Sequence, residues 1–389
     1  MQEQVWLDDT SCDLGEFARH VSQVTKAADY PHAIEIAKNI PVYDGAALVA
    51  QNETDEDWKP VMAEWNRAFA SGPGIIAIRR GYTDTQLIDD VTEVLNSIIA
   101  EEEADGAGQG DHFAAAGANS RVWNAHEKLG VKSPELFVRY NANECVRRAS
   151  EAWLGTGYQI TTQANVVRPG GKAQTAHRDY HMGFQSSEDL KTYPATQHAL
   201  SAQLTLQGAV AHCDMPLVSG PTKLLPYSQS YLPGYLAVLR DDFRGFFEEN
   251  YVQMPLRKGD LLFFNPATFH AAGENTSSDI QRFANLMQVG SAYGRSIEIV
   301  DRARLSQAVY ADLSAAAVQG QLTPREVDNV VAASAEGYPF PANLDIDSPL
   351  SGMAPPSQQD VMRQALVEGW GPEAFAQAIA EQLERKRSH

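Results

Sequence analysis

The sequence has no long apolar run. Its longest ones, such as Gly74–Ile78 and Leu261–Phe264, are far shorter than the roughly 18–20 residues that cross a membrane. The first residues also lack the basic and apolar regions of a signal peptide. We therefore expect a cytoplasmic protein with no membrane partner.

Cysteine is scarce, and basic residues are outnumbered by acidic ones. Cys12, Cys145 and Cys213 are far apart in the chain, which excludes a disulfide framework and offers no CxxC pair for zinc or an iron–sulfur cluster. With 50 acidic against 31 basic residues, the net charge of −19 repels phosphodiester backbones. We expect a small-molecule substrate and no nucleic-acid partner.

The chain of 389 residues has 43% hydrophobic and 21% charged residues, a composition typical of folded globular proteins. Residues 1–60 read as a polar, irregular or partly helical lead-in. Residues 61–298 begin with a strand and an amphipathic helix and continue, from about 155, as short alternating segments typical of a β-sandwich or barrel. Residues 299–389 form a helical extension that could pack on the same domain or, in a homo-oligomer, on a second subunit. We expect a mainly β fold with N-terminal α/β elements and flanking helices.

A histidine and an aspartate two residues apart carry the first chemical signal. Gly170 and Gly171 disfavour a helix just before residues 175–181, so we expect this segment to be extended. Side chains alternate along a strand, which puts His177, Asp179 and His181 on one face. Such a pair, joined by a distant histidine, forms the 2-His-1-carboxylate triad that holds iron(II) with open coordination positions.

The motif alone is weak, because about half a match to His-x-Asp is expected by chance in a chain of this composition. A second match indeed occurs at His212 and Asp214. Those residues follow an alternating strand and enter a turn-rich stretch, where we expect Asp214 to cap a loop. We therefore favour His177 and Asp179.

His270 is the candidate third ligand, since it follows the strand Leu261–Phe264 and a turn. Arg282 begins the next predicted strand, and its guanidinium could form a bidentate pair with a carboxylate. Histidine, carboxylate, histidine and arginine in this order suit iron and a dicarboxylate co-substrate. The structural alternatives are that His270 is a core histidine and Arg282 part of a surface ion pair.

These residues resemble the phytanoyl-CoA dioxygenase family of Fe(II)/2-oxoglutarate oxygenases. The resemblance covers about residues 70–290 and rests on the strand Gly74–Arg80 and its helix, on His177 and Asp179, on residues 219–229, and on His270 with Arg282. It implies a double-stranded β-helix (jelly-roll, cupin-like) core. It also implies that His177, Asp179 and His270 bind Fe(II), and that Arg282 binds the distal carboxylate of 2-oxoglutarate. Many relatives carry a hydroxyl residue two positions after the arginine, where this chain has Ala284.

Two predicted strands have an unusually polar face. Alternation sets Gln163 and Asn165 together on one strand, and Gln203, Thr205 and Gln207 together on another. Inside a barrel, Gln163 and Asn165 could contact 2-oxoglutarate; alternatively these faces meet solvent. We list three further candidates for contact with the substrate or with the metal ligands: His181, Arg121 and Gln203.

The expected reaction is oxidative decarboxylation of 2-oxoglutarate to succinate with O₂, coupled to hydroxylation of an unactivated C–H bond. Because Asp179 fills the carboxylate position, we expect no site for a halide. A cupin-like metal enzyme that does not use 2-oxoglutarate, and a catalytically silent ligand-binding β-barrel, are the alternatives. No basic cluster for the phosphates of an acyl-CoA is visible in the sequence.

Overall fold

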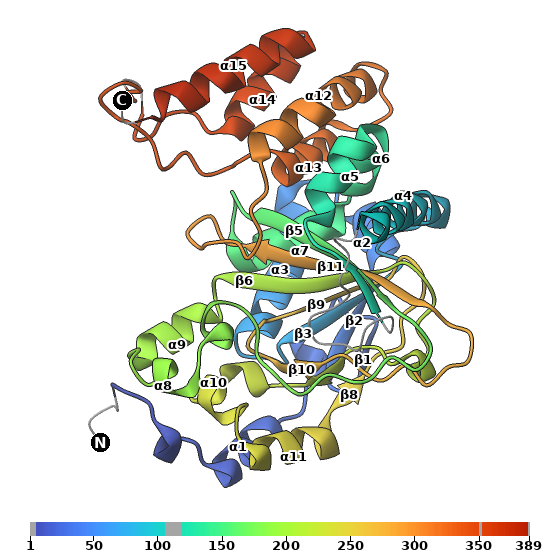
Figure 1. Cartoon of the computed structure of the whole chain (residues 1–389), viewed down its shortest axis with the longest axis vertical. Coiled ribbons are helices and arrows are strands. Elements are labelled where there is room, and N and C mark those ends of the chain that lie inside the picture. Colours follow the sequence, from blue (N-terminus) through green and yellow to red (C-terminus); the bar gives the residue numbers. More distant parts are fainter. Residues whose placement is uncertain (1–4, 106–118, 350–351, 388–389) are drawn as a thin grey trace.

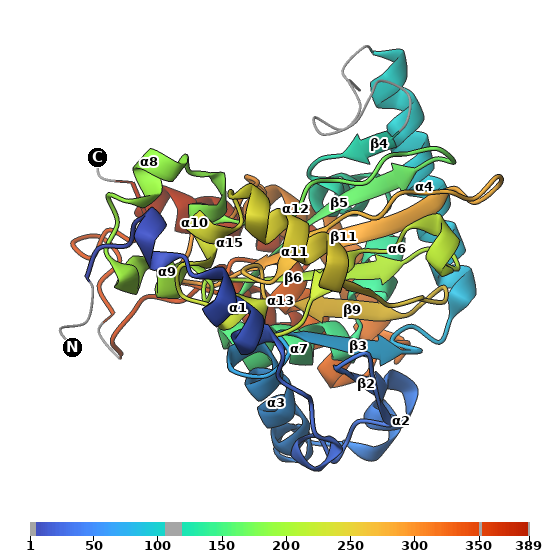
Figure 2. The ribbon, with the colours of Figure 1, turned by 90° about the horizontal axis from the view of Figure 1, so that it is seen from below.

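Two sheets pack against each other. The computed structural model describes residues 5–105, 119–349 and 352–387. The larger sheet is mixed, because β2 and β3 run parallel while its other neighbouring strands are antiparallel. Figure 2 shows most of its strands side by side. Their spatial order is β1 (Glu35–Ala37), β2 (Ile40–Asp44), β3 (Ile75–Arg79), β9 (Leu261–Phe264), β6 (Thr205–Ala211), β11 (Arg282–Gly290), β5 (Gln159–Val167) and β4 (Asn119–Val122).

The smaller sheet has the order β10 (Phe269–Ala271), β7 (Lys223–Leu225) and β8 (Val252–Gln253). A buried apolar cluster joins it to the larger sheet, with Leu224 of the smaller sheet meeting Ala77 and Phe264 of the larger one. We call the side of the larger sheet that faces the smaller one its inner face.

Helices cover the outer face of the larger sheet and the far side of the smaller one (Figure 1). The α-helices within the described residues are α1 (Leu14–Val21), α2 (Gly45–Gln51), α3 (Asp55–Ala70), α4 (Thr85–Ala104), α5 (Ala125–Lys132), α6 (Pro134–Asn141), α7 (Glu144–Leu154), α8 (Ser187–Leu190), α9 (Ala195–Ser201), α10 (Gly234–Ala237), α11 (Asp241–Asn250), α12 (Arg302–Val318), α13 (Pro324–Ser334), α14 (Gln358–Glu368) and α15 (Pro372–Arg385). Across the part of the chain that the structure describes, no helix combines the length and apolar character that a membrane crossing requires.

Alternation along the strands of the larger sheet separates an apolar outer face from a mixed inner face. On β9, Leu261 and Phe263 point outward into the main core, while Leu262 and Phe264 point inward. The main core also contains buried side chains of α3, α4, α12 and α15, such as Trp65. The C-terminal helices therefore share the hydrophobic core of the sheet.

Two expectations about elements need correction. The lead-in is not only irregular or helical, because residues 35–44 supply β1 and β2, and β2 joins the sheet by pairing with β3. The strand predicted to carry Gln203, Thr205 and Gln207 begins only at Thr205, because a helix that starts after Pro194 continues to Ser201.

Candidate metal centre

The segment that carries His177 lies along β10 of the smaller sheet. The backbone N–H of His177 donates to the carbonyl oxygen of His270 at 3.0 Å, and the N–H of His270 donates back at 3.1 Å. Two residues on, the N–H of Asp179 donates to the carbonyl oxygen of Pro266 at 2.9 Å. The His270 ring lies 4.9 Å from the ring of Phe264 on the inner face. The two histidines and the aspartate thus meet between the sheets.

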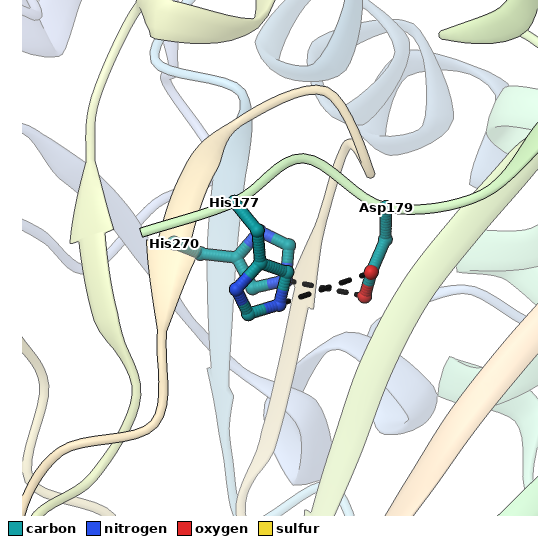
Figure 3. A group of neighbouring side chains, drawn as sticks. All are labelled: His177, Asp179 and His270. Atoms are coloured by element: carbon teal, nitrogen blue, oxygen red, sulfur yellow. Dashed lines mark hydrogen bonds and ion pairs between the residues drawn. The ribbon is translucent and has the colours of Figure 1, made fainter. Parts of the chain in front are cut away.

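The three side chains converge on one point (Figure 3). Nε2 of His270 lies 3.3 Å from Oδ2 of Asp179, and Nε2 of His177 lies 3.8 Å from Oδ1. The two imidazole rings are 4.4 Å apart between centroids. One possible ligand atom from each residue falls within 4.8 Å of the others, and these three form the sole such group among the described residues. This spacing is suited to one shared cation.

Hydrogen bonds to the backbone orient both imidazoles. Nδ1 of His177 lies 2.8 Å from the carbonyl oxygen of Thr175, and Nδ1 of His270 lies 2.8 Å from that of Thr268. A carbonyl oxygen can only accept, so each Nδ1 carries the proton. In the neutral rings both Nε2 atoms therefore present lone pairs toward Asp179, which is the arrangement that metal-binding histidines adopt.

The electrostatics of the group favour the form that binds a metal. Burial alone would raise the pKa of Asp179, but the adjacent His177 and His270 and the hydrogen bond from Gln207 outweigh it and lower that pKa. Burial and the neighbouring His270 lower the pKa of His177, against the opposing effect of Asp179. At neutral pH Asp179 is a carboxylate and His177 is unprotonated.

Gln207 on β6 fixes the carboxylate. Its Nε2 donates to Oδ2 of Asp179 at 2.6 Å and lies 3.4 Å from the hydroxyl oxygen of Tyr180. The polar alternation of this strand puts Gln207 on the same face as Gln203, the candidate named from the sequence. Position along the strand distinguishes the two glutamines. Gln207 lies inside β6, where the strand fixes the direction of its side chain, whereas Gln203 lies in the exposed turn before the strand.

The side chain of Arg178 points to the side opposite His177 and Asp179, as expected for an extended segment. Its side chain points away from the triad and is buried beneath the smaller sheet, where its guanidinium donates to the carbonyl oxygen of Tyr231 at 2.9 Å. It also lies over the rings of Tyr235 and Phe269, 4.9 Å and 5.3 Å from their centroids. Arg178 thus anchors the segment between His177 and Asp179 to the loop near residue 230.

Arg282 is buried at the start of β11 without an acidic partner in the described ranges. Its Nη1 donates to the carbonyl oxygens of Ser219 at 3.1 Å and Gly273 at 3.2 Å. Burial lowers its pKa to about 10, so it remains charged at neutral pH. Gly273 follows His270 by three residues, so the guanidinium lies against the loop that leaves the histidine. Its burial without a counter-charge makes Arg282 a candidate for pairing with an anion.

Gln163, Asn165 and Arg121 are on the inner face of the same sheet as Arg282. In the β5–β11 register Asn165 is opposite Ala284, and in the β4–β5 register it is opposite Arg121. Gln163 and Asn165 are buried, so this polar face does not meet solvent. Nη1 of Arg121 lies 3.4 Å from Oε1 of Gln163, and Oδ1 of Asn165 is buried without a hydrogen-bond partner. The face offers unused polar atoms to a polar ligand.

The structure places two other candidates away from the triad. The chain leaves the extended conformation at Tyr180 and His181, whose φ values are 59° and 48°, so His181 does not continue on the face of His177. His181 instead lines a cavity next to the sheet, with Nε2 3.4 Å from Oγ1 of Thr205. Gln203 contacts the carbonyl oxygen of Ala199 in its exposed turn.

The rival pair has other partners. Nδ1 of His212 lies 2.8 Å from Oγ1 of Thr92, and Nε2 lies 2.9 Å from the hydroxyl oxygen of Tyr140. Burial lowers the pKa of His212 to about 3. Asp214 accepts from the backbone N–H of Lys258, as expected for a residue that caps a loop. Both ring nitrogens of His212 are engaged in the helix-covered core.

Residues 68–284 match the family model described as phytanoyl-CoA dioxygenase, which is more than half of the chain. Comparison with curated proteins finds no match. Among solved structures, the non-haem alpha-ketoglutarate-dependent epimerase SnoN from nogalamycin biosynthesis is 16% identical, with 60% of this chain and 83% of that chain covered at a TM-score of 0.41. The carbocyclase SnoK from the same biosynthesis is 19% identical, with coverage of 62% and 86% and a TM-score of 0.42. The family match spans the triad and Arg282.

Proposed function

The chain belongs to the phytanoyl-CoA dioxygenase family, and from this premise we propose that it hydroxylates an unactivated C–H bond of a small molecule. It is a non-haem iron enzyme of the 2-oxoglutarate-dependent class, and it uses Fe(II), 2-oxoglutarate and O₂. Bound iron supplies the oxidative decarboxylation of 2-oxoglutarate to succinate and CO₂ and the activation of O₂ toward the C–H bond.

We assign the iron ligands as His177, Asp179 and His270. One observation carries this assignment: Nε2 of His177, Nε2 of His270 and the carboxylate of Asp179 converge, while both Nδ1 protons are used by backbone carbonyls. When both rings are neutral, these Nε2 atoms and the carboxylate are all acceptors, and a cation between them relieves their mutual repulsion. Two imidazoles and one carboxylate are the donor set of non-haem iron(II) oxygenases.

Arg282 is assigned to the distal carboxylate of 2-oxoglutarate, since it is the buried cation nearest in the chain to the His270 loop and lacks an acidic partner in the described ranges. Gln163 and Asn165 are assigned to further polar contacts with that co-substrate. The two sheets are consistent with the double-stranded β-helix of the family. On this reading residues 61–298 are the oxygenase domain and 299–389 a helical extension.

Asp179 decides the expected outcome. Its carboxylate occupies the position that a halide would otherwise take, and the hydrogen bond from Gln207 holds it there. The sheets on either side limit the access of water to the reacting atoms. These features favour hydroxylation over halogenation.

The test is anaerobic loading with Fe(II) and 2-oxoglutarate, followed by ¹⁸O₂ in chloride buffer with a library of small molecules. We expect one labelled oxygen in succinate, one in a hydroxylated product and no chlorinated product. A chlorinated product would refute the hydroxylase assignment. Iron binding without any succinate would favour a cupin-like enzyme that does not use 2-oxoglutarate, and failure to bind iron would favour a silent barrel.

A further inference from the structure

A cavity of about 180 Å³ opens beside the triad. Its buried wall is formed by Thr161, Thr205 and Gln288, which lie on the inner face of β5, β6 and β11. Its outer wall includes His181 and the exposed Phe184 from the 3₁₀-helix that follows Asp179. The cavity therefore lies between the larger sheet and the chain that leaves the metal ligands.

The cavity is linked to the triad through Tyr180 and Gln207. Tyr180, the residue after Asp179, lines it. Gln288 is opposite Gln207 in the β6–β11 register, and Gln207 donates to both Asp179 and Tyr180. A molecule in the cavity thus lies one side chain away from the carboxylate ligand.

The cavity is separate from the site assigned to 2-oxoglutarate. Gln288 and Gly290 line it at the end of β11, whereas Arg282 begins that strand. Six residues of strand separate Arg282 from Gln288, which is about 20 Å at roughly 3.3 Å per residue. A five-carbon diacid held at Arg282 is far shorter than this distance, so the cavity stays available to a second molecule.

The lining has one fixed charge, and it is positive. Arg295 lines the cavity, is exposed, and makes no ion pair with a carboxylate of the described residues. Aspartate and glutamate are missing from the lining, although the chain carries 50 acidic residues. The lining thus carries a positive side chain in a protein whose net charge is negative.

Two exposed apolar side chains also line the cavity. Phe184 and Ile297 line the cavity and are both exposed, at 58% and 38%. Tyr293, two residues before Arg295, is also exposed. Exposed large apolar side chains gathered around a polar cavity mark a ligand surface.

We propose that this cavity binds the substrate, and that the substrate is an amphipathic monoanion. Its carboxylate or similar anionic group pairs with Arg295, and its apolar body lies against Phe184 and Ile297. This assignment rests on the proposed function, because it takes the molecule in the cavity to be the one oxidised at the triad. Arg295 is a specificity-determining residue, and it has no part in holding iron or 2-oxoglutarate.

The test uses four probes on protein loaded anaerobically with Fe(II) and saturating 2-oxoglutarate: 3-phenylpropionate, 3-phenylpropanamide, 3-phenylpropylamine and acetate. Binding is measured by titration calorimetry. Because a charged pair adds to the apolar contact, 3-phenylpropionate should bind about tenfold or more tightly than the amide, the amine or acetate. Arg295→Gln should reduce its affinity to that of the amide, and Arg295→Lys should retain part of the preference.

The matched control is Arg19→Gln, which removes the same charge from an exposed arginine on α1, outside the cavity lining. It should leave the preference intact, and iron content and 2-oxoglutarate affinity should be the same in all variants. Equal or undetectable binding of the three phenylpropyl probes, or an unchanged preference in Arg295→Gln, would overturn the assignment of the cavity. Loss of iron or 2-oxoglutarate binding in the wild type would instead refute the proposed function.

Discussion

Replacing Gln207 by leucine removes a neutral donor from the carboxylate of the triad. Gln207 is buried at 8% exposure, and leucine fills a similar volume, so the change acts mainly on the hydrogen bond to Asp179. That bond is 2.6 Å long and its acceptor is charged. Hydrogen bonds of this kind are worth about 1.5–3 kcal/mol.

A loss of that size corresponds to about 10- to 150-fold in affinity. We expect Gln207→Leu to weaken Fe(II) binding by this factor, since an unrestrained carboxylate must be ordered by the metal itself. The measurement is an anaerobic titration of Fe(II) against a competing chelator, with the fold checked by circular dichroism.

Gln203→Leu is the matched control, because it removes the same group four residues earlier, in an exposed turn. It should leave iron affinity unchanged. Wild-type iron affinity in Gln207→Leu, or an equal loss in both variants, would refute the role given to Gln207.

Three further predictions concern buried ionisable side chains. Arg282→Leu should raise the KM for 2-oxoglutarate by more than tenfold at unchanged iron content, because about 2 kcal/mol of charged pairing is lost; unaltered kinetics of succinate formation would remove Arg282 from the site. Arg178→Met should lower the free energy of unfolding in urea by about 3 kcal/mol or more, because buried carbonyls lose their donor, and it should weaken Fe(II) binding as well. An unchanged free energy of unfolding in Arg178→Met would show that the hydrogen bonds of Arg178 do not stabilise the fold. Burial lowers the pKa of His126 and His212 from 6.5 to about 3, so the unfolded state binds more protons and stability falls as the pH drops below 6.5. Each of these two histidines should lower the free energy of unfolding by about 2 kcal/mol at pH 5. His126→Gln should therefore make the free energy of unfolding in urea less dependent on pH. The same pH dependence in wild type and variant would contradict the low pKa of His126.

The juxtaposition of His177, Asp179 and His270 could be anticipated because it depends on local rules. Strand alternation over three residues puts His177 and Asp179 on one side and Arg178 on the other, and the structure has this arrangement. His270 required one further inference, namely that the segment after β9 returns past them.

The structure differs from the expected backbone conformation where tertiary contacts override local pattern. His181 leaves the face of His177 because the chain turns at Tyr180. Neither Tyr180 nor His181 is a glycine, so the sequence carries no signal for this turn. Gln203 falls outside β6 because α9 extends to Ser201. The strand β2 could not be predicted from its own residues, since it is held by parallel pairing with β3, more than thirty residues away.

The central claim is that His177, Asp179 and His270 bind one Fe(II). The most direct measurement is anaerobic iron stoichiometry of the folded wild type and of His177→Ala, Asp179→Ala, His270→Ala and His212→Ala, with iron quantified after removal of excess metal. We predict one iron per chain in the wild type and in His212→Ala, and little or none in the three triad variants. Stoichiometric iron in His177→Ala, with loss in His212→Ala, would contradict this account and move the metal to the other pair.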